Sequence, residues 1–199
     1  MDRFFRLDLP VLVFARNVLV LSLLGLVPLL AVFVLRTPGF AELLLGNGEA
    51  MRLFLRQVVT NGLPVVFVIN YASLFLFAAL AEGRRLGPGL VLLGDPLLRV
   101  LLFVGLHALI YPLSADWFGS FGGDRMLALH VVGPTLVRSA QFGNISGVYL
   151  YATLAGALPL YAAAMARMGW LRWPLALGVF ALAAALLTGA AELIVRLQG

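Results

Sequence analysis

Long apolar intervals without a charged residue are the main pattern of this sequence. Five intervals of 19, 25, 16, 28 and 19 residues, rich in Leu, Val, Ala and Phe, lie at 17–35, 57–81, 100–115, 139–166 and 173–191. About 20 largely apolar residues in a helix cross roughly 30 Å of hydrocarbon. Charged residues are disfavoured at its centre. The pattern therefore predicts an all-α, polytopic transmembrane helix bundle in which residues 1–199 form a single integral membrane domain.

Helix start and stop signals set the expected edges of the spans. We predict five spans, at 10–35, 58–80, 96–111, 148–166 and 173–191. Asp95 and Pro96 have the residue types of an N-cap and a first helical position. This interpretation places Asp95 and Arg99 in a first turn near the lipid headgroups, and Pro112 ends the helix.

The segment before the second span also carries a helix start. Asn47 is a suitable N-cap, and Glu49 would lie in the first turn, where the helix dipole favours an acidic residue. Arg52 and Arg56 are four residues apart on one face, among apolar neighbours. The pattern predicts either an interfacial helix that leads into the second span or an early start of that span.

A sixth apolar stretch, residues 126–137, is too short to cross. Its 12 residues would extend about 18 Å as a helix, and Gly133-Pro134 interrupt it. We therefore favour five spans plus a short re-entrant or interfacial apolar segment. The alternative is a sixth span extended through residues 138–142.

Composition and charge placement support a membrane protein with a cytoplasmic N-terminus. With 62% hydrophobic residues, the chain is more apolar than a soluble domain, where about half is usual. All 14 basic residues are Arg, scattered near the span ends, where they indicate topology and lipid-phosphate contacts; we expect no nucleic-acid partner. The Arg-for-Lys bias favours a bacterium, and hence its cytoplasmic (inner) membrane.

The positive-inside rule sets the orientation. With the N-terminus inside and five spans, eight Arg residues fall on the cytoplasmic side and the other six outside; the eight are Arg3, Arg6, Arg16, Arg84, Arg85, Arg99, Arg167 and Arg172. Six spans give the same eight against six. The rule therefore does not decide between five and six spans.

Several kinds of chemistry are excluded by the absence of their residues. The chain has no Cys, so disulfides, thiolate metal sites and Cys nucleophiles are ruled out. Walker A, G-x-S-x-G and H-E-x-x-H motifs are also absent. In the run 143–147 the serine stands one place too late for a nucleophile elbow, so the run is interpreted as a helix start.

A few polar residues in or beside the spans are candidates for a site. Asn70 and His107 fall near the middle of their spans, where unpaired polar groups are costly, and with Tyr111 they form a candidate polar pocket. Asp116, Asp124 and His130 in the irregular region 113–147 extend this candidate set. Helix clamping by Asn70 and solvated loop charges at Asp116 and Asp124 are the simpler interpretations.

The two histidines offer one cofactor hypothesis. If the chain returns antiparallel after the third span, His107 and His130 could ligate haem b as a bis-imidazole pair. A single pair is thin support, so no cofactor and no metal are expected. Hydrogen bonding to neighbouring helices is the simpler role of both rings.

Three functions remain open from the sequence. The first is an accessory subunit of a membrane complex or a small transport component, with the lipid bilayer and other membrane subunits as partners. The second is a membrane-embedded enzyme acting on a lipid-linked substrate at the outer face. The third is a haem b-type electron-transfer subunit.

Small residues in the last two spans suggest close helix packing. Ala152 and Gly156 in one, and Ala181, Ala185 and Gly189 in the other, recur at spacings of four. Such spacings let helix backbones approach closely. We therefore expect these two spans to pack against each other.

Overall fold

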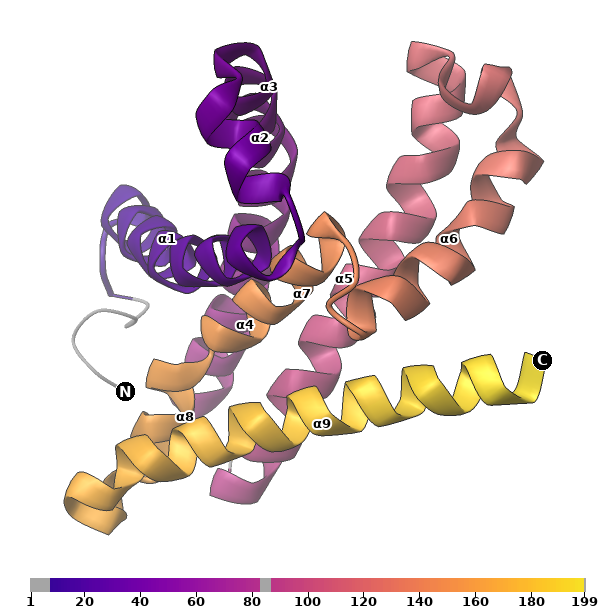
Figure 1. The fold of residues 1–199 in the computed structure, drawn as a ribbon. Helices are drawn as coiled ribbons and strands as arrows, with labels where there is room; N and C mark the ends of the chain where they lie inside the picture. The colour runs from indigo at the N-terminus through magenta and orange to yellow at the C-terminus, as the bar shows by residue number, and fades with distance from the viewer. Residues whose placement is uncertain (1–7, 83–86, 199) are drawn as a thin grey trace.

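The computed structural model describes residues 8–82 and 87–198, which form helices and no strand (Figure 1). Arg3, Arg6, Arg84 and Arg85, which enter the charge count, lie outside the described residues. In chain order the elements are α1 (Val11–Arg36), α2 (Phe40–Gly46), α3 (Gly48–Gln57), η1 (Val58–Gly62), α4 (Leu63–Glu82), α5 (Pro88–Phe118), η2 (Ser120–Gly123), α6 (Arg125–Ala140), α7 (Ile145–Ala155), α8 (Leu158–Ala164), η3 (Ala166–Leu171) and α9 (Arg172–Gln198).

Five helical segments of the described chain are long and apolar enough to cross a membrane. They are Val11–Arg36, Gly48–Leu80, Pro88–Phe118, Ile145–Ala164 and Ala166–Leu197. The predicted all-α bundle with five spans is therefore confirmed. Four of these helices are longer than their charge-free intervals, because charged residues at the ends of a span need not end the helix. The fourth helix, Ile145–Ala164, is shorter than its interval.

The sixth apolar stretch forms α6, which is a helix of only 16 residues. At 1.5 Å per residue it extends about 24 Å, less than the roughly 30 Å of the hydrocarbon. Pro134 lies inside this helix and does not end it. One side of α6 is buried, at Ala128, Val132 and Ser139, because it packs against α5, α7 and α9.

The predicted helix start at Asn47 is confirmed. The Asn47 side chain accepts hydrogen bonds from the backbone N–H groups of Glu49 and Ala50, at 3.0 and 3.1 Å. The helix continues without a break through η1, a π-helical turn, into α4. The segment is thus an early start of the second span. A π-helical turn inside an α-helix often marks a functional site.

The core forms where α1 packs against α4 and α7. A Cβ atom built on Gly25 of α1 would lie 3.0 Å from the carbonyl oxygen of Ala152 in α7, so a larger residue would push the two helices slightly apart. Gly156 is likewise covered by Asn70 of α4. The small residues Ala152 and Gly156 of the fourth span therefore face the first two spans. The last two spans do pack against each other, as predicted, but mainly through α8 and α9.

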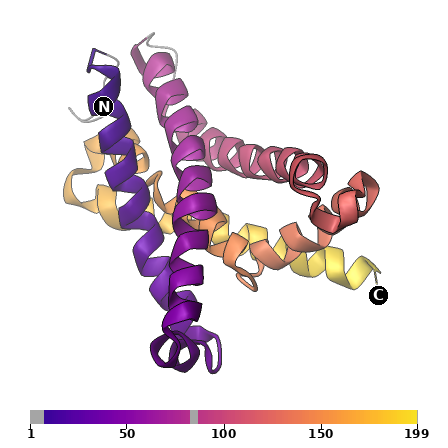
Figure 2. The same ribbon diagram turned by 90° about the horizontal axis from the view of Figure 1, so that it is seen from above.

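The last span lies at the edge of the bundle. In Figure 2, α9 runs beside α6 and away from α1 and α4. It packs mainly against α8 and α6 through one face that includes the buried Ala176 and Ala191. Ala181, Ala185 and Gly189 lie on its exposed side.

The third span differs most from its prediction. Helix α5 begins at Pro88, with Gly87 as the N-cap, and continues past Pro112 to Phe118. Asp95 is therefore not an N-cap, and Pro96 is not a first helical residue; both lie two turns inside the helix. A proline removes one backbone hydrogen bond, and a long helix held by its neighbours tolerates that loss.

Candidate functional site

A buried ion pair lies at the centre of the bundle. Arg99 Nε donates to Asp95 Oδ2 at 2.8 Å, and both side chains are 0% exposed. They are one helical turn apart on α5, so the helix itself holds them in register. This corrects the prediction that the two charges lie in the first turn of a helix.

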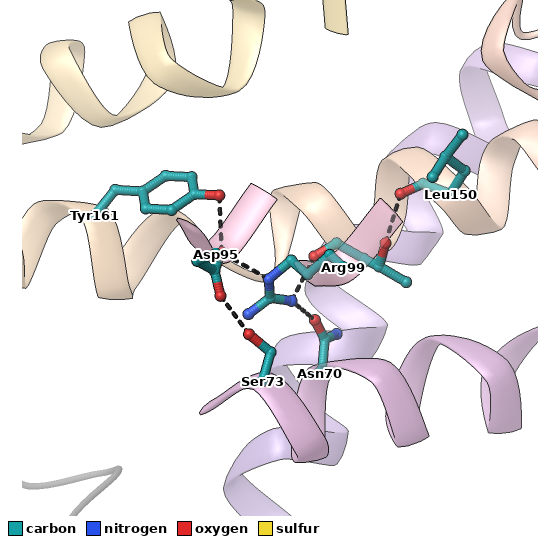
Figure 3. Close-up of polar contacts among 7 residues, drawn as sticks. Asn70, Ser73, Asp95, Arg99, Leu150 and Tyr161 are labelled. Atoms are coloured by element: carbon teal, nitrogen blue, oxygen red, sulfur yellow. Dashed lines mark hydrogen bonds and ion pairs between the residues drawn. The ribbon is translucent and has the colours of Figure 1, made fainter. Parts of the chain in front are cut away.

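Three donors surround the Asp95 carboxylate (Figure 3). Besides Arg99, Tyr161 of α8 donates from its hydroxyl to Oδ2 at 2.8 Å. Ser73 of α4 donates from its hydroxyl to Oδ1. The carboxylate therefore links α4, α5 and α8.

The Arg99 guanidinium links the remaining core helices. Its Nη1 donates to the Asn70 side-chain oxygen and, at 2.7 Å, to the carbonyl oxygen of Thr153 in α7. The Asn70 amide in turn donates to the hydroxyl of Ser22 in α1 at 2.9 Å. The Nη2 atom has no partner within the described parts of the chain.

This network holds the helices together. Buried charges are costly unless they are paired and hydrogen-bonded, and here the pairing draws on five helices at once. We call Ser22, Asn70, Ser73, Asp95, Arg99, Thr153 and Tyr161 the core cluster. All seven are at most 1% exposed, so no ligand reaches them in this arrangement.

A cavity of about 600 Å³ lies at the opposite end of α5 from Asp95. Its lining residues belong to the α3–η1–α4 helix, to the C-terminal part of α5 with η2, and to the start of α7. Its lining residues are Gln57, Thr60, Asn61, Pro64, Val65, His107, Ile110, Tyr111, Leu113, Ser114, Trp117, Phe118, Ser120, Ile145, Ser146 and Tyr149. This volume falls in the range of roughly 300–1,000 Å³ that is usual for small-molecule sites.

Tyr149 supplies an unsatisfied polar group to the cavity. The residue is 5% exposed, and its hydroxyl is buried with no hydrogen-bond partner in the described structure. Its ring packs on Gly62 of the π-helical turn, where an added Cβ atom would lie 2.1 Å from the ring. The turn therefore makes room for an aromatic ring whose hydroxyl lacks a protein partner.

His107 supplies a hydrogen-bond acceptor to the same cavity. Its Nδ1 lies 3.0 Å from the carbonyl oxygen of Phe103, which can only accept, so Nδ1 carries the proton. In the neutral ring Nε2 is then an acceptor. The ring lies between Phe103, at 4.2 Å between centroids, and Tyr111, at 5.8 Å, tilted by 36° and 31° to them. These two contacts restrict its orientation.

The structure distributes the predicted site residues over three places. His107 and Tyr111 line the cavity, whereas Asn70 belongs to the core cluster. Asp116 accepts from Arg125 Nε at 2.6 Å, and this hydrogen bond raises the pKa of Arg125. Asp124, by contrast, caps α6.

The remaining predicted residue, His130, is exposed on α6. Its Nδ1 donates to the carbonyl oxygen of Met126 at 3.0 Å. It does not line the cavity. Within residues 8–82 and 87–198, no three His, Asp or Glu side chains gather in a way that could hold a metal ion.

The sequence did not indicate most of the core cluster, nor Tyr149 in the cavity wall. A signal existed on α5, where Asp95, Arg99, Phe103, His107 and Tyr111 follow one another at intervals of four. A polar and aromatic row on one helix face predicts a face directed into protein. Tyr149 had no such signal, since its position depends on a π-helical turn about 90 residues earlier.

Comparison with protein-family models, with curated proteins and with solved structures found no match to this chain.

Proposed function

We propose that this chain is a small transport component that binds one amphiphilic molecule in the cavity between α3–α4, α5 and α7. The observation that carries the proposal is the buried, unpartnered hydroxyl of Tyr149 at the wall of a cavity of about 600 Å³. A buried hydroxyl without a partner costs about 1–3 kcal/mol. The hydroxyl is closed to solvent in this arrangement, so a ligand in the cavity recovers that loss when the wall beside Tyr149 opens to admit the bond.

The lining supports an amphiphile. Polar groups from Gln57, Asn61 and His107 share the wall with the apolar side chains of Val65 and Ile110. Trp117 and Phe118 follow at the end of α5 and are 72% and 80% exposed. Aromatic residues with this exposure are typical of the membrane interface, where the polar part of a lipid lies.

The orientation favoured by the Arg count places the cavity on the non-cytoplasmic side. Helices α2 and α3 follow the first span, and the cavity uses α3 and the end of the third span. With a cytoplasmic N-terminus, both elements reach the outer side of the membrane. We therefore propose that the ligand enters from the outer leaflet.

The cavity favours binding over catalysis because no acidic residue is among those that line it. General acid–base catalysis usually needs a titratable pair within hydrogen-bond reach of the substrate. None of the lining residues is acidic, and Asp116, Asp124 and His130 are engaged elsewhere. His107 is the one imidazole in the wall.

A quenching experiment tests the proposal. Replacing Trp170 and Trp173 by Phe leaves Trp117, at the cavity, as the reporter among the three Trp residues. We expect a brominated monoacylglycerol to quench Trp117 saturably in the full chain in detergent. Ser146→Phe, which fills the cavity, should weaken this binding at least tenfold.

The matched control adds the same bulk elsewhere. Ala181→Phe on the exposed side of α9 should leave the quenching curve unchanged. Quenching that rises linearly with lipid, or that both Phe variants leave unchanged, would overturn the proposal.

A further inference from the structure

We infer that the cavity selects an uncharged, hydroxylated headgroup, such as the sugar of a glycolipid, over a phosphate-bearing one. This inference rests on the proposed binding function and adds the chemical class of the ligand.

The wall of the cavity contains no acidic side chain and no Arg. Its polar side chains are amides, hydroxyls, an indole and an imidazole; they belong to Gln57, Asn61, Thr60, Ser114, Ser120, Ser146, Tyr111, Tyr149, Trp117 and His107. No Arg is among the lining residues, although Arg is the only basic residue type of the chain besides its two His. A phosphate is recognised best by charge-assisted bonds from Arg or Lys, and this wall provides none.

The cavity wall presents both hydrogen-bond donors and hydrogen-bond acceptors. His107 offers Nε2 as an acceptor, and the free hydroxyl of Tyr149 both donates and accepts. The side chains of Gln57 and Asn61 each carry an amide donor and an acceptor. A sugar hydroxyl also donates and accepts, so it can pair with every one of these groups, whereas phosphate oxygens only accept.

Two hydroxyls of the cavity wall already donate hydrogen bonds within the protein. Ser114 donates to Ser120 at 2.7 Å, and Thr60 donates to the carbonyl oxygen of Arg56 at 2.8 Å. These two hydroxyls are already used as donors. Among the groups left for a ligand, Tyr149 and His107 carry the most buried polar side chains of the wall.

A phosphocholine headgroup does not suit this wall. The aromatic rings of Tyr111 and Trp117 could attract a quaternary ammonium. In a phospholipid, however, that ammonium is accompanied by a phosphate, which would be buried here without a cationic partner. Leaving a charge unpaired in such a site is costly.

The test is a competition between lipids with identical acyl chains. With Trp117 as reporter and the brominated monoacylglycerol bound, monoglucosyl diacylglycerol, phosphatidylglycerol and phosphatidylcholine are added separately, and free glucose is added alone. We expect the glucosyl lipid to displace the probe at a concentration at least tenfold below either phospholipid. Free glucose should not displace it at a thousandfold higher concentration, because it lacks the apolar part.

Two variants connect the preference to the wall. Tyr149→Phe should reduce the glucosyl preference at least fivefold, whereas Tyr71→Phe, in the aromatic group with Phe14 and Phe75, should not change it. Equal displacement by all lipids, or stronger displacement by a phospholipid, would overturn the inference and leave the proposed function standing. A probe that never binds saturably would overturn the proposed function itself.

Discussion

Arg99 Nε lies 2.8 Å from Asp95 Oδ2, and neither side chain is exposed. Their partners come from α4, α7 and α8, and Ser22 of α1 joins the network through Asn70, so one ion pair on α5 connects the core helices of the bundle. The cavity at the other end of α5 is lined by the same helix. The core cluster therefore fixes the helix that carries His107 and Tyr111 into the cavity.

Removing one charge of the pair should destabilise the protein strongly. Asp95→Leu leaves the Arg99 guanidinium buried without its counter-charge, and losses of about 3–5 kcal/mol are usual for such a change. The double variant Asp95→Leu/Arg99→Leu should lose less than Asp95→Leu alone, because no unpaired charge remains. Thermal unfolding in detergent measures both.

An exposed pair provides the comparison for that experiment. Glu49 and Arg52 are joined at 2.6 Å, but their side chains are 60% and 63% exposed. Replacing either by Ala should change the unfolding temperature little, because exposed ion pairs contribute little. The role of the buried pair would be contradicted if the loss of stability in Asp95→Leu/Arg99→Leu equalled the sum of the losses in Asp95→Leu and Arg99→Leu.

Gly156→Ala should disturb the core cluster through Asn70. The added Cβ atom would lie 2.3 Å from Asn70 Oδ1, the atom that accepts from Arg99. Overpacking of this kind costs about 1–3 kcal/mol. Gly178→Ala, where a Cβ atom meets nothing within 4 Å, should unfold at the wild-type temperature or slightly above. The prediction fails if the two variants unfold alike.

Tyr149→Phe should have opposite effects on stability and on binding. Without ligand, the variant removes a buried hydroxyl that has no partner, so we expect the free energy of unfolding to stay unchanged or rise by about 1 kcal/mol. With the glucosyl lipid, the same variant should bind more weakly. A clear loss of stability in the lipid-free variant would show that the hydroxyl already has a partner in the protein.

The absence of cysteine makes the topology directly measurable. Single cysteines at Glu42, which is exposed on α2, and at Met168, which is 55% exposed in η3, can be labelled with a membrane-impermeant maleimide. Five spans place these positions on opposite sides, with Glu42 labelled in intact cells and Met168 only after lysis. Labelling of both from the same side would require a sixth span.

The sequence predicts the spans well because hydrophobicity and charge act along the chain. The charge-free intervals located all five spanning segments, and Asn47 and the run 143–147 marked true helix starts. The predicted start of the third span at Asp95 was wrong. Both Gly94-Asp95-Pro96 and Gly87-Pro88 contain residues typical of a helix start. Local chemistry does not decide between two such starts; packing of Asp95 against Ser73 and Tyr161 does.

The cavity was only partly predictable for a similar reason. His107 and Tyr111 share one face of a single helix, so their association followed from spacing. Asp116, Asp124 and His130 follow closely in the sequence, yet each bonds locally to its own or the neighbouring helix and not to the cavity. Tyr149 and Gly62 meet only because α7 packs beside the π-helical turn.

The most direct test of the account is an experimental structure of the full chain solved with monoglucosyl diacylglycerol. We expect density for the sugar in the cavity, with one of its hydroxyl oxygens within about 3 Å of the Tyr149 hydroxyl. We also expect Asp95 and Arg99 to remain paired in the core. A cavity filled by protein side chains, or a lipid bound only at the exposed face of α9, would contradict the account.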